Sequence, residues 1–386
     1  MLEATIKKGF VVYIFLSIFE FALTYSSGSL LKLYGFVLMG GWGILLLRRR
    51  MLLKRYLIYL ILFFLWMALS LIWSPQGDMD VYYVMAMGNM IALVLISSTL
   101  NWSEEDILRL LKAFQLGALF FSVLIIMGSN RYYEGSLRYT IILFGSKMDP
   151  NNIAGLLIPG ILLSFNYLLN SEKLLISFTT LFAAVFAFVG TGSRGGMIAL
   201  LLGMMLLLFH KAPLNRTTRT WKSIKGILGI AIFAFLIYSV IQSRIEKPLL
   251  ERYDATKALS DRGSNRLDLW ERGLELFNEK PLAGIGIGGF EALTGKGLHN
   301  QFLIVLVEGG IIGFSLFIIA LIQIIKMTRI NKLVLPLVVL LSTFVVCFFL
   351  DAYNKKFFWN GILLAVIMVN ATQFSQSSGF KQHPVE

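Results

Sequence analysis

Hydrophobic residues recur along almost the whole chain in runs about as long as a helix that crosses a membrane. A bilayer core needs about 20 mostly apolar residues in one helix. The runs that approach this length are residues 9–25, 30–47, 55–73, 81–100, 110–128, 153–169, 174–190, 196–209, 226–243, 301–325, 333–350 and 357–374. We therefore expect an all-α polytopic membrane protein with about twelve transmembrane helices. No small-residue cleavage signal follows the first run, so we expect it to be a helix rather than a signal peptide.

The composition excludes a soluble enzyme. Hydrophobic residues make up 57% of the 386 residues and charged residues 15%, and the mean hydropathy is +0.74. An ordinary soluble domain is about 45–50% apolar and about 25% charged. The single cysteine, Cys347, lies inside an apolar run. An intramolecular disulfide and a cysteine-based zinc site are therefore excluded as well.

The distribution of the positive charges predicts the topology. Twelve crossings leave both termini on one side of the membrane, and that side would carry 19 of the 35 lysines and arginines, many of them in residues 48–55 and 211–225. The short loops of the other face carry seven. Because short cytoplasmic loops are enriched in lysine and arginine, we expect both termini in the cytoplasm. The net charge of +13 then reflects this bias and not a nucleic-acid partner.

The remaining nine basic residues lie in one long loop, residues 244–300, which we expect to face the periplasm. The chain is then a single membrane domain, with nine helices in residues 1–243 and three helices and a cytoplasmic tail in residues 301–386. Within the loop, residues 265–279 have the spacing of an amphipathic helix. Such a helix either lies on the membrane surface or caps the helix bundle. Its predicted apolar face consists of Leu267, Trp270, Leu274 and Phe277.

Two short motifs in the outward loops have a structural interpretation beside a functional one. Residues Gly284 to Gly289 match G-x-G-x-x-G, but a dinucleotide site needs this string between a strand and a helix. We expect a tight turn instead, because glycine adopts backbone conformations that other residues avoid. Asp78 and Asp80 have a spacing that could share a hard cation. Two acids in a short loop are also common without a function, and we expect no metal site.

Arg194 and His299 are the strongest candidates for chemistry. Arg194 lies at the outward end of an apolar run, where an arginine is costly unless it has a function; an arginine that reaches the membrane surface is the alternative. The neighbouring Gly195 exposes backbone N–H groups at a predicted helix N-terminus, which favours an anion. His299 is the one histidine expected on the outward face, since His210 and His383 lie on the cytoplasmic side. Imidazole suits a general base near neutral pH, although a lone histidine is more often structural.

The order of the motifs resembles the O-antigen ligase and polymerase superfamily, polytopic enzymes of bacterial surface polysaccharide assembly. The motifs are TGSRGG, R-x-x-x-W from Arg266 to Trp270, PLAGIGIGGF, LHNQFL and EGGIIG, between Thr191 and Gly313. The residues from Asp149 to Asn152 resemble a weaker feature of the same superfamily. The resemblance implies a GT-C-like membrane glycosyltransferase in the bacterial inner membrane, with one long periplasmic loop.

The resemblance also implies the reaction and its residues. It implies an inverting, metal-independent transfer of a glycan from undecaprenyl diphosphate on the periplasmic face, without a cofactor. Arg194 and Arg266 would hold the diphosphate, because the planar fork of arginine binds phosphate with two hydrogen bonds. Gly195 and Asn300 are further candidates for substrate binding. His299 would activate the acceptor hydroxyl.

The acceptor is left open by the sequence. A ligase would transfer O-antigen to the lipid A–core, and we expect this activity. A polymerase would extend the glycan on its lipid carrier with the same motifs. A lipid or glycan transporter is the third possibility. It is disfavoured because a transporter site lies near the membrane midplane between inverted repeats, whereas the candidate residues gather at one face.

Overall fold

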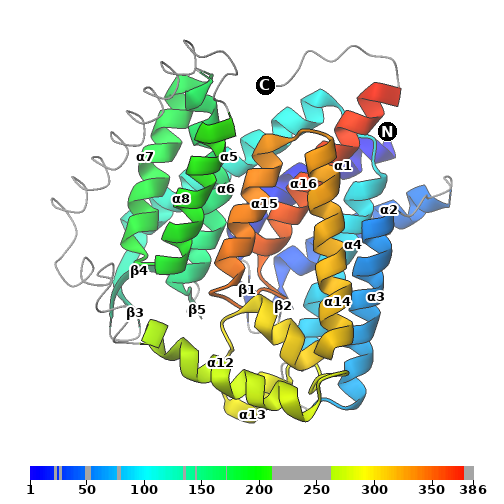
Figure 1. Cartoon of the computed structure of the whole chain (residues 1–386). Helices are drawn as coiled ribbons and strands as arrows, with labels where there is room; N and C mark the ends of the chain where they lie inside the picture. Colours follow the sequence, from blue (N-terminus) through cyan, green and yellow to red (C-terminus); the bar gives the residue numbers. More distant parts are fainter. Residues whose placement is uncertain are drawn as a thin grey trace.

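A computed structural model describes residues 1–20, 24–25, 28–47, 54–75, 80–133, 136–143, 146–170, 172–210 and 262–377. Most of these residues form helices that run roughly side by side in a bundle (Figure 1). A short 3-10 helix, η2 (Ser70–Ile72), extends α3. The apolar helices are α1 (Leu2–Ser17), α2 (Leu30–Leu46), α3 (Arg55–Leu69), α4 (Asp80–Thr99), α5 (Glu104–Gly128), α6 (Pro150–Leu169), α7 (Leu174–Gly190), α8 (Arg194–His210), α14 (Gln301–Ile330), α15 (Val334–Cys347) and α16 (Lys356–Ser377).

The predicted runs correspond to these helices, apart from residues 226–243, which lie outside the described residues. The first helix begins at Leu2 and ends at Ser17, several residues earlier than the run 9–25. Among the described residues, five helices are long and apolar enough to cross a membrane, and four apolar helices are shorter. The chain is therefore an α-helical membrane protein, while the number of twelve crossings stays a prediction. The five long helices span Arg55–Ile72, Asp80–Thr99, Glu104–Gly128, Pro150–Leu169 and Gln301–Ile330.

Short strands add to the expected all-α fold. The strands β1 (Thr24–Tyr25) and β2 (Gly28–Ser29) pair before α2, and β3 (Ser129–Tyr133), β4 (Ser136–Leu143) and β5 (Ser146–Lys147) form an antiparallel sheet between α5 and α6. Aromatic and β-branched residues in β4 favour this conformation. The ring of Tyr139 packs on the backbone of Gly190, where an added Cβ would lie 2.1 Å from the ring. The sheet thereby anchors the turn that leads into α8.

The outside of the bundle is apolar. Large hydrophobic side chains such as Leu33, Phe36 and Val37 on α2 and Leu175 on α7 are exposed. A contiguous apolar surface of this kind is rare on a soluble monomer. Inside the bundle, α3 packs on α14 and α8 packs on α15. The exposed side chains therefore have the distribution expected of a lipid-facing surface.

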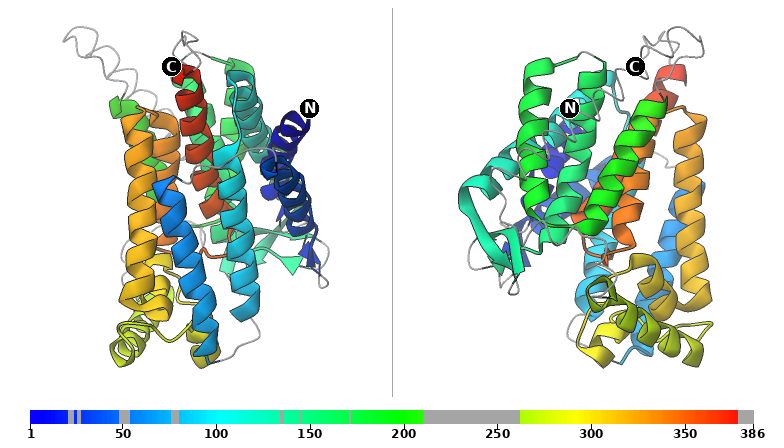
Figure 2. Two further views of the ribbon diagram at one scale, coloured as in Figure 1. Left: turned by 90° about the vertical axis from the view of Figure 1, so that its right-hand side faces the viewer. Right: turned by 60° about the vertical axis from the view of Figure 1, so that its left-hand side comes forward.

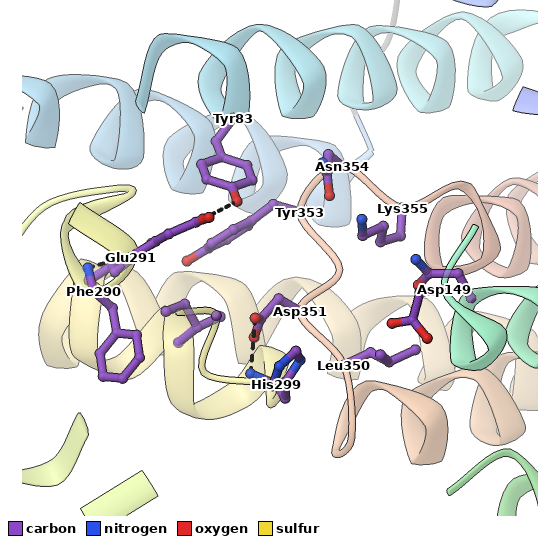
Figure 3. A pocket seen from close by; sticks show the side chains of 14 residues that line it. Tyr83, Asp149, Phe290, Glu291, His299, Leu350, Asp351, Tyr353, Asn354 and Lys355 are labelled. Atoms are coloured by element: carbon purple, nitrogen blue, oxygen red, sulfur yellow. Dashed lines mark hydrogen bonds between the residues drawn. The ribbon is translucent and has the colours of Figure 1, made fainter. Parts of the chain in front are cut away.

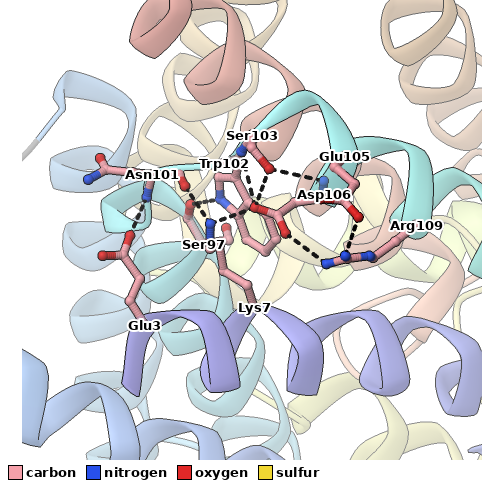
Figure 4. A network of polar contacts seen from close by, with 9 residues as sticks. All are labelled: Glu3, Lys7, Ser97, Asn101, Trp102, Ser103, Glu105, Asp106 and Arg109. Carbon is pink, nitrogen blue, oxygen red and sulfur yellow. Dashed lines mark hydrogen bonds and ion pairs between the residues drawn. The ribbon is translucent and has the colours of Figure 1, made fainter. Parts of the chain in front are cut away.

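The two ends of the bundle differ. The helix α12 (Arg262–Glu279) lies across one end together with the short α13 (Gly289–Thr294), whereas α1 begins and α16 ends toward the opposite end (Figures 1 and 2). Toward that opposite end, Lys7 joins α1 to the start of α5 through Asp106 Oδ2 at 2.5 Å (Figure 4). Lys7 Nζ also donates to the carbonyl of Asn101 at 2.8 Å. These contacts fix α1 at its first turns.

The packed face of α12 differs from the predicted one. Leu267 and Leu274 are exposed, whereas Gly273 and Leu276 are buried. The reason is the close approach at Gly273, where an added Cβ would lie 2.8 Å from the side chain of Leu298. The helix therefore turns its glycine toward the bundle and packs on α14. It caps the bundle, and its two outer leucines remain free to contact a membrane surface.

Candidate active site

A pocket of about 210 Å³ is lined by polar and aromatic side chains (Figure 3). Part of its lining comes from α13, which lies at the same end of the bundle as α12 (Figure 1). Helices α4, α6, α13 and α14 and the loop between α15 and α16 contribute to the pocket, so residues far apart in the sequence meet here. It contains His299 and several carboxyl, hydroxyl and amide side chains. The lining residues are Tyr83, Asp149, Asn152, Phe290, Glu291, Gly297, His299, Ile304, Glu308, Leu350, Asp351, Tyr353, Asn354 and Lys355.

His299 is held in an unusual backbone conformation directly before α14. Its φ of 58° lies in the left-handed region, which costs free energy for a residue other than glycine. The backbone N–H of His299 donates to Asp351 Oδ2 at 2.9 Å, and the N–H of Asn300 donates to Oδ1 at 3.0 Å. Trp270 Nε1–H donates to the carbonyl of Leu298 at 3.1 Å. These three bonds fix the backbone so that the imidazole lines the pocket.

Asp351 is a residue of this site that the sequence did not indicate. It lies in the loop between α15 and α16, 52 positions from His299. Burial raises the pKa of its carboxyl, and the two backbone N–H donors together with the nearby His299 oppose this shift only in part. The signal in the sequence was an acidic residue between two apolar runs, which by itself does not name a partner.

Asn300 has a clear structural function. Its side-chain Oδ1 accepts hydrogen bonds from the backbone N–H groups of Phe302 and Leu303, each at 3.1 Å, and so caps α14. Gln301 Oε1 accepts the N–H of Ala352 at 2.5 Å. The start of α14 is thus joined to the Asp351 loop on both sides of the cap. Substrate binding by Asn300 stays a prediction, since its side-chain oxygen already has partners.

The helices that carry the two predicted arginines meet at the ring of Phe349. Arg194 is the first residue of α8, and an added Cβ on the next residue, Gly195, would lie 2.4 Å from this ring. The guanidinium carbon of Arg266, on α12, lies 5.9 Å from the centre of the same ring. Because Phe349 is two residues from Asp351, both helices lie close to the His299 site. The pocket itself is not lined by either arginine.

A third arginine, Arg138 on β4, supports the turn before Arg194. Its Nε–H donates to the carbonyl of Thr191 and its Nη2–H to Asn151 Oδ1, both at 2.8 Å. Asp149 Oδ1 accepts the N–H of Asn151 at 2.8 Å and caps α6. Arg138 thereby joins the TGSRGG turn to the start of α6. Asp149 and Asn152, from the weaker motif, line the pocket.

The glycine-rich segment forms a tight turn, as predicted. Gly284 and Gly286 have φ values of 72° and 98°, and Gly286 donates its N–H to the carbonyl of Glu308 at 3.0 Å. In α14 the backbone breaks at Gly310, with φ 63°, and an added Cβ there would lie 2.2 Å from the carbonyl oxygen of Leu282. The turn therefore fills the break in α14 and brings Glu308 to the pocket.

Asp80, the second acid of the D-x-D motif, is buried within the protein. Its Oδ2 lies 2.7 Å from Ser74 Oγ, which lies 2.9 Å from the carbonyl of Ile287. Asp80 thus contributes to the contact between the end of α3 and the glycine-rich turn. Asp78 lies outside the described residues.

One comparison with known proteins found a related family. Residues 179–318 match the model of a protein family described as O-antigen ligase. The matched segment includes Arg194, Arg266 and His299, but ends before Asp351. No curated protein matches the sequence of the chain. Over residues 179–318 the chain is thus similar to the O-antigen ligases, which confirms its resemblance to the O-antigen ligase and polymerase superfamily of membrane enzymes.

Proposed function

We propose that this protein is an O-antigen ligase of the bacterial inner membrane, which transfers a glycan from undecaprenyl diphosphate to the lipid A–core on the periplasmic face. One observation carries the proposal. The loop at Phe349 and Asp351 joins the backbone of His299 to the two arginine-bearing helices at one end of the bundle. A candidate base that lines the pocket and two candidate phosphate ligands on helices next to the Asp351 loop therefore occur in one region of the protein.

The proposed reaction is a single displacement at the anomeric carbon of the donor glycan. His299 accepts the proton of the acceptor hydroxyl as its oxygen forms a bond to that carbon. The bond from the same carbon to the diphosphate oxygen breaks, and the diphosphate leaves with the electron pair. Because the nucleophile enters opposite the leaving group, the configuration inverts. No metal ion or cofactor takes part in these steps.

The proposed task of Arg194 and Arg266 is to bind the leaving diphosphate. Negative charge builds on the diphosphate as the carbon–oxygen bond breaks, and oriented cationic donors stabilise this charge best where water is partly excluded. The guanidinium group offers two parallel N–H donors to one phosphate. The position at the end of the bundle suits a donor whose lipid chain remains in the membrane.

The test of the base uses three variants of His299. All three variants, His299→Ala, His299→Gln and His299→Asn, remove the base. Asparagine in addition tolerates the left-handed backbone conformation of this position. We expect all three to bind the lipid-linked donor and to transfer the glycan about 10²–10⁴-fold more slowly, the usual contribution of a general base. Donor binding and transfer are measured on purified protein in nanodiscs. Full transfer by well-folded His299→Ala would remove His299 from the mechanism.

The acceptor is identified by the lipopolysaccharide of a deletion strain. A strain without a ligase makes core that carries no O-antigen, whereas a strain without a polymerase makes core with a single repeat unit. We expect the first result. The second would assign the alternative activity, a polymerase with the same lipid-linked donor. Purified protein that moves the donor across a bilayer without any transfer would instead support the transporter.

A further inference from the structure

One part of the pocket has no task in this reaction. Glu308 on α14 and Tyr353 in the loop before α16 are 2% and 4% exposed, and both line the pocket. Glu308 Oε1 accepts the N–H of Phe290 at 3.3 Å. Glu308 Oε2 and the hydroxyl of Tyr353 make no hydrogen bond of standard geometry among the described residues, although the two side chains are near enough to interact with each other. Oδ1 of Asn152, which also lines the pocket, has no partner among these residues either.

Buried polar atoms without a partner are uncommon in folded proteins because their desolvation is not repaid. Three of them around one pocket match a ligand with several hydroxyl groups, which can each donate and accept hydrogen bonds. Next to them, Tyr83 OH donates to Glu291 Oε2 at 2.6 Å, and the rings of Tyr83 and Tyr353 lie 6.2 Å apart. Aromatic rings beside hydrogen-bond acceptors suit a sugar, which has apolar C–H faces and a rim of hydroxyl groups.

The lining of the pocket offers few cationic partners to an anionic ligand. Its lining contains the carboxyl groups of Asp149, Glu291, Glu308 and Asp351, against Lys355 and His299. A diphosphate would gain little here. The candidate diphosphate ligands, Arg194 and Arg266, are not among the lining residues. In this arrangement the diphosphate of the donor would bind at the two arginines, and the pocket would bind an uncharged group with several hydroxyls.

We propose that Glu308 and Tyr353 form the subsite for the acceptor sugar, where they bind the hydroxyl groups next to the one that His299 activates, and that this subsite selects a neutral sugar over an acidic one. The assignment rests on the proposed function, because it takes the His299 pocket as the place of glycosyl transfer. It adds the chemical class of the acceptor unit and the residues that recognise it.

Three variants isolate the contacts. Glu308→Gln keeps an oxygen for the N–H of Phe290 and replaces the other carboxyl oxygen by an NH2 group, which donates hydrogen bonds but does not accept them. Tyr353→Phe removes only the hydroxyl. Tyr56→Phe is the matched control, because Tyr56 on α3 is 3% exposed, its hydroxyl also makes no hydrogen bond of standard geometry among the described residues, and it does not line the pocket.

Binding is measured without transfer, by saturation-transfer NMR on the full chain in nanodiscs. The probes are methyl α-glucopyranoside, methyl α-galactopyranoside and the corresponding uronates. We expect at least one neutral glycoside to bind and its uronate to bind roughly tenfold more weakly. Tyr353→Phe and Glu308→Gln should each weaken the neutral probe about fivefold, in line with the loss of one hydrogen bond. Tyr56→Phe should bind like the wild type.

Kinetics then separate this proposal from the proposed function. With lipid A–core as acceptor, Glu308→Gln and Tyr353→Phe should raise the acceptor KM and leave donor binding unchanged. Glycoside binding that depends on both residues in a protein without transferase activity would refute the function and keep the sugar site. Transfer with an unchanged acceptor KM in both folded variants, equal binding of uronates, or no saturable binding of either neutral glycoside would overturn the subsite.

Discussion

At the scale of single residues, the candidate site depends on the ring of Phe349, on which the helices of Arg194 and Arg266 converge. Each arginine is thus carried by a helix that packs against Phe349, close to the pocket. If the two arginines bind the diphosphate as proposed, a lysine would not replace either of them fully, because only the planar guanidinium group offers two parallel donors to one phosphate.

The first prediction concerns these arginines. Arg194→Lys keeps the charge but loses the planar fork, so we expect it to lose most of the transfer activity, about tenfold or more. Arg266→Ala should lose at least as much. The control is Arg272→Ala on α12, where the exposed side chain pairs only with Glu275 at 2.7 Å. Transfer is assayed on purified protein at equal amounts, and full activity of both Arg194→Ala and Arg266→Ala would contradict the diphosphate assignment.

The second prediction is a pH dependence of stability from Asp351. Burial raises the pKa of its carboxyl, so the folded protein retains a proton over a pH range in which the unfolded chain has released it. The free energy of unfolding contributed by this group therefore falls as the pH rises from the ordinary aspartate pKa of about 3.9 through the raised value. Asp351→Asn should lack this component. Thermal unfolding of both proteins between pH 4 and pH 8 measures it, and parallel curves would contradict the prediction.

At the scale of elements, the break in α14 is supported by the glycine-rich turn. The backbone of Gly310 has φ 63° and ψ −170°, a region open essentially to glycine. The turn at Gly284 and Gly286 supplies N–H donors to the carbonyls near the break. Two glycine motifs that are 20 to 30 positions apart in the sequence thus form one structural unit, which holds Glu308 in the pocket.

The third prediction tests this unit. Gly310→Ala places a Cβ 2.2 Å from the carbonyl oxygen of Leu282 in a conformation that costs of order 1–3 kcal/mol by itself. We expect a clear fall of the thermal unfolding midpoint. Gly295→Ala is the control, because Gly295 also has a positive φ, 67°, but has nothing within 4 Å of an added Cβ. A Gly310→Ala protein as stable as Gly295→Ala would show that the close contact is unimportant.

At the scale of the whole molecule, α12 and α13 lie at one end of the bundle, and the start of α1 and the end of α16 lie toward the other (Figures 1 and 2). Two residues of α13, Phe290 and Glu291, line the pocket. The positive-inside distribution predicts that the second end faces the cytoplasm. In this orientation the proposed donor and the proposed lipid-anchored acceptor would both meet the site at the membrane surface.

The fourth prediction concerns this orientation. Glu279→Cys at the end of α12 and Arg329→Cys near the end of α14 introduce thiols at exposed positions, while the native Cys347 is buried. A membrane-impermeant maleimide should label Glu279→Cys in cells whose outer membrane is permeabilised, and Arg329→Cys only after the inner membrane is opened. Labels in residues 48–55 and 210–225 should behave like Arg329→Cys. The reverse pattern would overturn the periplasmic site.

The sequence by itself determined the helices, the amphipathic element in the long loop and the candidates Arg194, Arg266 and His299. Arg266 was a candidate only because the order of the motifs resembles the superfamily. The helices, the amphipathic element and the candidate Arg194 depend on local properties, namely the length of apolar runs, helical spacing, and the cost of a charge near a membrane. The glycine-rich turn was predictable for the same reason, because φ preferences belong to the residue.

Only the tertiary structure decided which residues share the site. Asp351 binds the backbone of His299 across 52 positions, and Phe349, Tyr353 and Glu308 acquire their places through the Asp351 loop and the break in α14. The packed face of α12 is set at Gly273, which lies against Leu298. This close packing leaves Leu267 and Leu274 exposed on the other side of the helix. Such contacts depend on which distant segments of the chain meet in space. A pattern of residues along the chain does not give the spatial distance between such segments.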